Sequence, residues 1–333
     1  FSKNIWGAPD GLAELVLAQT ASRRQSLIYI ARDDARMAAM SNALRQLAPE
    51  LDLLEFPAWD CLPFDRLSPQ GGLVGKRIET LSQLSAGSQV EPRILLTTIN
   101  AFLQRVPPKT YFADSSLVVA SGLATANLET GDSHHSAAYG HDPKAVDLRT
   151  NISKTFGPKT LTDYLASHAY LRTDTVRETG EFAVRGGILD VFPPGQAMPA
   201  RLDFFGDEIE SIRSFDPATQ RSTGEIDKLI LRPIAEFMIN DETIVKFRTG
   251  YLSLFGATAS KDALYESVSA GRSHPGIEHW LPLFHTHMVT LLDYCAGWPI
   301  ILDHEGDAAI TARYAQIHDF YEARLGHSSD AAA

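Results

Sequence analysis

The stretch from Glu178 to Ser222 constrains the fold of this chain most, because it alternates short runs of β-forming residues with residues that interrupt strands. Aromatic and β-branched residues come in groups of two or three, which Gly186-Gly187 interrupt and Pro193-Pro194 end. This pattern predicts a bulged strand followed by a turn. We therefore expect a sheet of short strands in the middle of the chain.

The segment from Arg201 to Phe205 alternates in polarity. A period of two places Leu202 and Phe204 on one face of a strand, and Arg201, Asp203 and Phe205 on the other. The second face would carry a charge pair beside a large aromatic side chain, which indicates a docking surface. The acidic residues that follow, Asp207 to Glu210, lie near Arg213, and we interpret them as a solvated, ion-paired edge rather than as acid-base catalysts.

The N-terminal third alternates between predicted strands and helices. Apolar runs predict strands at 26–31, 51–56, 94–98 and 117–120, and helical spacing predicts helices at 34–47, 73–84 and 100–106. Such alternation is typical of an α/β fold with a parallel sheet covered on both faces. Met37 and Met40 are interpreted as core residues.

The remaining periodic segments lie after residue 160. Helices are predicted at 161–170, 241–254, 260–270 and 307–325, a strand at 229–231, an aromatic turn at 276–284, and a buried strand at 299–302. Residues 122–156 lack periodicity and are rich in Gly, Ser, His, Asp, Asn and Thr, which predicts a long mobile loop or an insertion. His134, His135 and His141 lie there, but no carboxylate or cysteine stands at a spacing that would complete a metal site.

The length, charge and composition of the chain limit the number of domains and the classes of partner that we expect. A chain of 333 residues predicts two or three domains, and its net charge of -11 argues against non-specific wrapping of nucleic acid. No apolar run is long enough to span a membrane, and no signal-peptide pattern opens the chain. Cys61 and Cys295 have no companion ligands, which favours reduced thiols and a cytoplasmic location.

The segment from Trp6 to Leu15 lies where a nucleotide-binding fold would place its phosphate loop. If Gly11 is matched to the inner glycine of such a loop, Glu14 stands at the position of the phosphate-binding lysine and Leu15 at that of the magnesium-binding hydroxyl. Gly7 belongs to the same degenerate segment. A carboxylate there would repel a triphosphate. We therefore expect a degenerate, non-functional P-loop, no catalytic residues, and neither a cofactor nor a metal in this fragment.

The strand-rich stretch resembles a known signature. Residues 180–193, 201–213 and 215–222 are similar to the signature shared by the excision-repair protein UvrB and the Mfd family of transcription-repair coupling factors. Residues 59–69 and 276–284 resemble the coupling factors in particular. The intact P-loop and the tyrosine-rich hairpin of UvrB are missing from this chain.

The resemblance implies a UvrB-homology module of three domains. Residues 1–115 would be domain 1a, residues 116–228 domain 2 with a polar insertion at about 123–155, and residues 229–333 domain 1b. Domains 1a and 1b would form a degenerate RecA-like parallel sheet domain, and domain 2 would be an inserted mixed α+β domain. The polar insertion departs from the family, whose other members connect these elements in a few residues.

The resemblance also implies partners. Domain 2 of the family recruits UvrA to a stalled RNA polymerase, and the UvrA-contacting positions correspond to Arg185, Arg201 and Phe205 here. RNA polymerase binding and ATP-driven DNA translocation would belong to parts of a longer parent protein, whose C-terminal domain masks the UvrA face in the family.

The residues leave an alternative open, in which Phe205 packs in the core and both arginines pair with Asp203 or Asp207. Two rival functions are an active UvrB-like ATPase and direct binding of damaged DNA.

Overall fold

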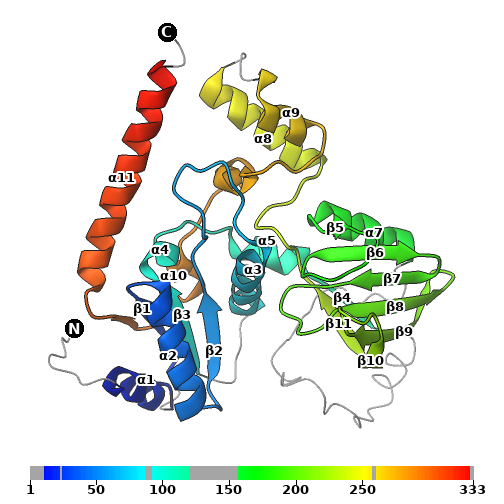
Figure 1. The fold of residues 1–333 in the computed structure, drawn as a ribbon, viewed down its shortest axis with the longest axis horizontal. Helices are drawn as coiled ribbons and strands as arrows, with labels where there is room; N and C mark the ends of the chain where they lie inside the picture. Colours follow the sequence, from blue (N-terminus) through cyan, green and yellow to red (C-terminus); the bar gives the residue numbers. More distant parts are fainter. Residues whose placement is uncertain (1–10, 23–24, 87–91, 121–156, 257–259, 331–333) are drawn as a thin grey trace. The chain divides into compact units, whose positions relative to one another are not determined.

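The computed structural model describes residues 11–22, 25–86, 92–120, 157–256 and 260–330 (Figure 1). The chain forms two compact units, each built from separate segments of the sequence. The first unit comprises Phe1–Asp65, Ser88–Arg105 and Thr290–Ala333, and the second comprises Arg66–Gly87 and Val106–Val289. The second unit is thus largely an insertion between segments of the first. The three-domain boundaries expected from the sequence stay a prediction.

A four-stranded parallel sheet organises the first unit. Its strand order is β12-β1-β3-β2, with β1 at Leu27–Ala31, β2 at Asp52–Phe56, β3 at Arg93–Thr98 and β12 at Ile300–Leu302. Every residue of β1 and β3 is buried, as expected for central strands covered on both faces. The predicted α/β class with a parallel sheet is confirmed.

Helices α1 (Leu12–Ser22) and α2 (Asp34–Leu47) share one hydrophobic cluster with the parallel sheet. Asp33 caps α2 by accepting a hydrogen bond from the backbone N–H of Arg36. Met37 and Met40 lie in this cluster, so their predicted core role is confirmed. The other helices of the unit are α4 (Ile99–Phe102), α10 (Leu291–Tyr294) and α11 (Gly306–Asp330).

The predicted burial of the strand at 299–302 is wrong. Strand β12 forms the edge of the sheet, and 46% of Ile300 and 39% of Leu302 are exposed. An edge strand pairs on one side only, and the described part of the chain leaves the side chains of β12 largely uncovered. Apolar composition alone does not distinguish an edge position from a central one.

A six-stranded sheet dominates the second unit, drawn in green in Figure 1. Its strand order is β10-β9-β8-β7-β6-β5, with β5 at Leu171–Arg172, β6 at Glu181–Arg185, β7 at Ile188–Val191, β8 at Ala200–Phe205, β9 at Glu208–Phe215 and β10 at Ser222–Glu225. All neighbours are antiparallel except β5 and β6. Helix α7 (Pro158–Ser167) packs against the sheet through Leu161 and Leu165.

The predicted strand at 117–120 does not extend the parallel sheet. As β4 (Leu117–Ala120), it pairs with β11 (Lys228–Leu231) in a separate antiparallel pair. The other helices of the second unit are α3 (Gly71–Ala86), α5 (Lys109–Ser115), α8 (Asp241–Phe255), α9 (Ala263–Ser269) and the 3-10 helix η2 (Ile277–Leu283). The polar insertion at 123–155, with His134, His135 and His141, lies outside the described residues.

Candidate functional site

The six-stranded sheet has one dry face, and an opposite face that is open to solvent except where Val176, Ala183 and Phe215 form a small buried cluster. The dry face packs against α7 in a cluster of buried aliphatic and aromatic residues that includes Leu189, Leu202 and Ile212, with Phe204 packed against it. Cross-strand register then places Ile188, Asp203 and Ser211 in one row of the opposite face. We call this opposite face the outer face. The predicted separation of Leu202 and Phe204 from Arg201, Asp203 and Phe205 is confirmed by the register and the burial.

Gly186-Gly187 form a tight hairpin turn, so the predicted bulge at this position is wrong. Arg185 pairs with Ile188 across the turn, which leaves two residues in the loop between β6 and β7. Gly186 has a φ of +60°, and a Cβ on Gly187 would lie 3.2 Å from the carbonyl oxygen of Phe204. The register of this sheet shifts instead between β8 and β9, where Asp203 and Phe204 pair with Ser211 and Ile209, and between β9 and β10, at Ser222 and Gly224. The hairpin brings Arg185 and Ile188 to the end of the outer face.

Arg201 is held by residues of its own sheet. Its Nε and Nη2 donate to the two carboxylate oxygens of Asp190 at 2.7 and 2.9 Å, and its Nη1 donates to the carbonyl of Gln220 at 3.3 Å. The guanidinium also lies 4.7 Å from the ring centroid of Phe215. The hydrogen bonds to Asp190 raise the pKa of Arg201. The expected alternative pairing with Asp203 or Asp207 is therefore wrong for Arg201.

Arg185 and Phe205 are accessible on the same face. The Arg185 guanidinium donates to the carbonyl oxygen of Asp174 at 2.6 and 3.1 Å, which orients this exposed side chain along the loop after β5. Phe205 is 81% exposed at the end of β8. The alternative in which Phe205 packs in the core is wrong.

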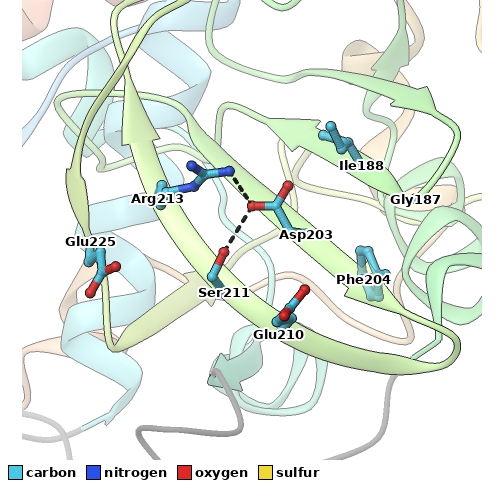
Figure 2. Close-up of a pocket in the computed structure, with 8 residues that line it drawn as sticks. All are labelled: Gly187, Ile188, Asp203, Phe204, Glu210, Ser211, Arg213 and Glu225. Carbon is cyan, nitrogen blue, oxygen red and sulfur yellow. Dashed lines mark hydrogen bonds and ion pairs between the residues drawn. The ribbon is translucent and has the colours of Figure 1, made fainter.

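Asp203 lies at the centre of a polar cluster on the outer face. It accepts hydrogen bonds from Arg213 Nη2 at 2.5 Å and from Ser211 Oγ at 2.9 Å, as Figure 2 shows. Arg213 is therefore paired with Asp203 rather than with the acidic run that begins at Asp207. Sequence reasoning missed both Asp190 and this cluster as parts of the site, because their pairings join different strands.

The same cluster lines a pocket of about 460 Å³. Glu225 of β10 lies beside Arg213, Glu210 lies beside Ser211, and the hairpin supplies an apolar side (Figure 2). The full lining is Gly187, Ile188, Asp203, Phe204, Glu210, Ser211, Arg213 and Glu225. The outer face thus combines an exposed aromatic residue, a cation and a polar pocket.

The N-terminal P-loop positions lie in the first unit. Gly7 is outside the described residues, Gly11 has a φ of +88°, and Glu14 and Leu15 belong to α1. Glu14 is buried and accepts a hydrogen bond from Arg36 Nη1 at 3.0 Å, whereas Leu15 is exposed. Arg36 also contacts Asp303, to which the Tyr29 hydroxyl donates at 2.6 Å. Glu14 is therefore engaged within its own unit, and degeneracy of the loop stays a prediction.

Within the described ranges, no group of three His, Cys, Asp or Glu residues is arranged to hold a metal ion. In that part of the chain, no helix is both long and apolar enough to cross a membrane. Cys61 and Cys295 do not form a disulfide bond with each other.

The region that contains the six-stranded sheet matches a known family model. Residues 148–237 match the family model described as the UvrB interaction domain, a range that contains β5 to β10. The chain is 32% identical over 316 residues to the transcription-repair-coupling factor of Haemophilus influenzae. The aligned region covers 94% of this chain and 24% of that protein.

Two further relatives carry the same description. The transcription-repair-coupling factor of Rickettsia bellii is 31% identical over 91% of this chain and 24% of its own length. That of Escherichia coli K12 is 30% identical over 81% of this chain and 20% of its own length. The chain spans about a quarter of the length of these curated relatives, and it belongs to the transcription-repair-coupling factor family.

Proposed function

We propose that this chain is a docking module that binds UvrA through the outer face of its six-stranded sheet, and so links a stalled RNA polymerase to nucleotide excision repair. One observation carries the proposal: Phe205, a large aromatic residue, is 81% exposed on a strand within the region that matches the UvrB interaction domain. An exposed phenylalanine on a rigid strand is the type of anchor that dominates interface energies once a partner covers it.

Arg185 supplies the charge beside this anchor. Its guanidinium donates to the carbonyl oxygen of Asp174 but stays exposed, so its remaining N–H groups are available to a partner carboxylate. Arg201 is assigned a different role, because Asp190, Gln220 and Phe215 already engage its guanidinium. We assign Arg201 as a positioning residue that keeps β7 and β8 in register under the contact residues.

The first unit is proposed to act as a rigid, non-catalytic platform with a degenerate RecA-like fold. Its parallel sheet supports the nucleotide-binding ancestry, and the pairing of Glu14 with Arg36 supports the loss of the phosphate site. In the longer protein, RNA polymerase, DNA and ATP would be bound by other parts. Calorimetric titration of this chain with ATP and magnesium should give no binding heat, and saturable binding would favour the rival, an active UvrB-like ATPase.

Binding of purified UvrA to the chain and to the Phe205→Ala variant tests the docking proposal. The variant should bind at least 30-fold more weakly, since an interface anchor contributes about 2 kcal/mol or more. Leu254→Ala is the matched control, because Leu254 is an apolar residue of the second unit that is 63% exposed on α8. Equal affinity of the three proteins for UvrA would refute the site. A parallel titration with UvrB distinguishes the two repair proteins, and preferential binding of UvrB would refute the choice of partner.

A further inference from the structure

The pocket on the outer face has an excess of negative charge. Three carboxylates line it, from Asp203, Glu210 and Glu225, against the single guanidinium of Arg213. Arg213 and Asp203 compensate each other through their ion pair. The exposed side chains of Glu210 and Glu225 have no hydrogen-bonding or ionic partner among the residues that the structure describes. Two uncompensated carboxylates therefore border the pocket.

The pocket also has an apolar side. Ile188, which follows the β6–β7 hairpin and is 37% exposed, supplies this apolar surface. Phe204 also borders the pocket, although its side chain packs against the cluster on the dry face. Figure 2 shows these two side chains on the side of the pocket away from Glu225. A ligand that fits must combine a hydrocarbon segment with a positively charged end. Long basic side chains have this composition, because their methylene stems pack on apolar surface while their charged ends reach polar groups.

We infer that this pocket receives an arginine side chain of UvrA. The inference rests on the function proposed above and specifies how the partner is recognised. A guanidinium can donate in two directions at once, so one arginine suits carboxylates that lie on separate strands, as Glu210 on β9 and Glu225 on β10 do. A bare metal ion fits less well, because the described carboxylates do not cluster as metal ligands.

The pocket would make the charge distribution of the docking face asymmetric. Arg185 at the hairpin presents a positive charge, and the pocket presents a negative one on the other side of Ile188. A partner surface must then offer an acidic group to Arg185 and an arginine to the pocket. Complementary charges of this kind raise the association rate and exclude partners with the reverse arrangement.

The test measures the affinity and the association rate of UvrA for the chain and for the Glu210→Gln/Glu225→Gln double variant. Both carboxylates are exposed, so the variant should keep its fold and its unfolding midpoint. We expect about tenfold weaker binding, a lower association rate and a weaker dependence on salt. Glu266→Gln is the control, since Glu266 is an exposed carboxylate of the second unit on α9, and it should bind as the unmodified chain does.

Phe205→Ala separates failure of this inference from failure of the docking site. If Phe205→Ala weakens UvrA binding while the double glutamine variant binds as the Glu266→Gln control does, the docking site stands and the arginine pocket is refuted. If the unmodified chain does not bind UvrA, both proposals are refuted. Charge reversal with Glu225→Lys should weaken binding further than neutralisation, and an unchanged or increased affinity would also count against an arginine in the pocket.

Discussion

The guanidinium of Arg201 and the carboxylate of Asp190 face each other across neighbouring strands and form two parallel hydrogen bonds, 2.7 and 2.9 Å long. The register of β7 and β8 places the two residues directly opposite each other. The Asp190 side chain is only 3% exposed, so its charge depends on Arg201 for compensation. Loss of UvrA binding in an Arg201 variant would therefore not demonstrate a lost contact.

Arg201→Ala should lower the free energy of unfolding by about 3 kcal/mol, because it leaves a buried carboxylate unpaired. Urea unfolding and hydrogen exchange of the β7 and β8 amides would measure the loss. Arg201→Ala/Asp190→Ala should be more stable than Arg201→Ala, since it removes the unpaired charge as well. Full stability of Arg201→Ala together with loss of UvrA binding would overturn the positioning role and make Arg201 a contact residue.

Local periodicity predicted the elements of this fold well, because burial on one face imposes a period that the residues must follow. The helix at 34–47 has the bounds predicted from the spacing of Met37, Met40, Leu44 and Leu47, and the alternation from Arg201 to Phe205 matches the two faces of β8. The edge position of β12 was not predictable, because it depends on which strand pairs with which.

The candidate site was predicted in part. The face that carries Phe205 follows from period two, but the partner of Arg201 does not, since Asp190 lies 11 residues earlier and meets it only through the pairing of β7 with β8. Residues 192–199 join those two strands, and the local residue pattern does not specify the register that this longer connection produces. The two-residue Gly-Gly loop between β-forming runs could have predicted the β6–β7 hairpin, but not the pairing of Asp190 with Arg201.

Gly276 and Gly186 form a matched pair for testing backbone requirements. Both have positive φ, +78° and +60°, but a Cβ on Gly276 would lie 2.7 Å from the carbonyl oxygen of Arg66, whereas a Cβ on Gly186 would meet nothing within 4 Å. Gly186→Ala should cost about 1 kcal/mol of unfolding free energy from backbone strain alone. Gly276→Ala should cost about 3 kcal/mol, because a backbone clash adds to the strain. Equal losses in thermal unfolding would contradict the close approach of the Arg66 carbonyl to Gly276.

The ion pair between Arg77 of α3 and Glu236 is almost fully buried, with side chains 0% and 1% exposed and hydrogen bonds of 2.6 and 3.3 Å. Glu236→Gln should destabilise the second unit by about 4 kcal/mol, because the buried guanidinium loses its counter-charge. The exposed pair of Lys159 and Asp163 on α7 is the control, and Asp163→Asn should change stability by less than about 0.5 kcal/mol. Similar losses for the two variants in urea unfolding would refute this ranking.

Two buried histidines should make the stability of the second unit depend on pH. Burial lowers the pKa of His168, although the hydrogen bond from its Nδ1 to the carbonyl of Tyr164 partly opposes the shift. Burial likewise lowers the pKa of His285, whose Nε2 bonds to the carbonyl of Glu236. Since the unfolded chain regains the ordinary histidine pKa of 6.5, the unfolded state binds more protons than the folded state at mildly acidic pH.

The free energy of unfolding should therefore be highest above pH 6.5 and should fall as the pH drops from 7.5 towards 5.5. Urea unfolding at pH 7.5, 6.5 and 5.5 would measure the slope, and His168→Gln and His285→Gln should each flatten it. His274→Gln is the control for the loss of an imidazole that is only partly buried. Burial raises the pKa of Glu278, whose proton uptake in the folded state acts in the opposite direction at more acidic pH, so the comparison is confined to pH 5.5 and above. If His168→Gln and His285→Gln both keep the pH slope of the unmodified chain, neither buried histidine sets the pH dependence of the unfolding free energy.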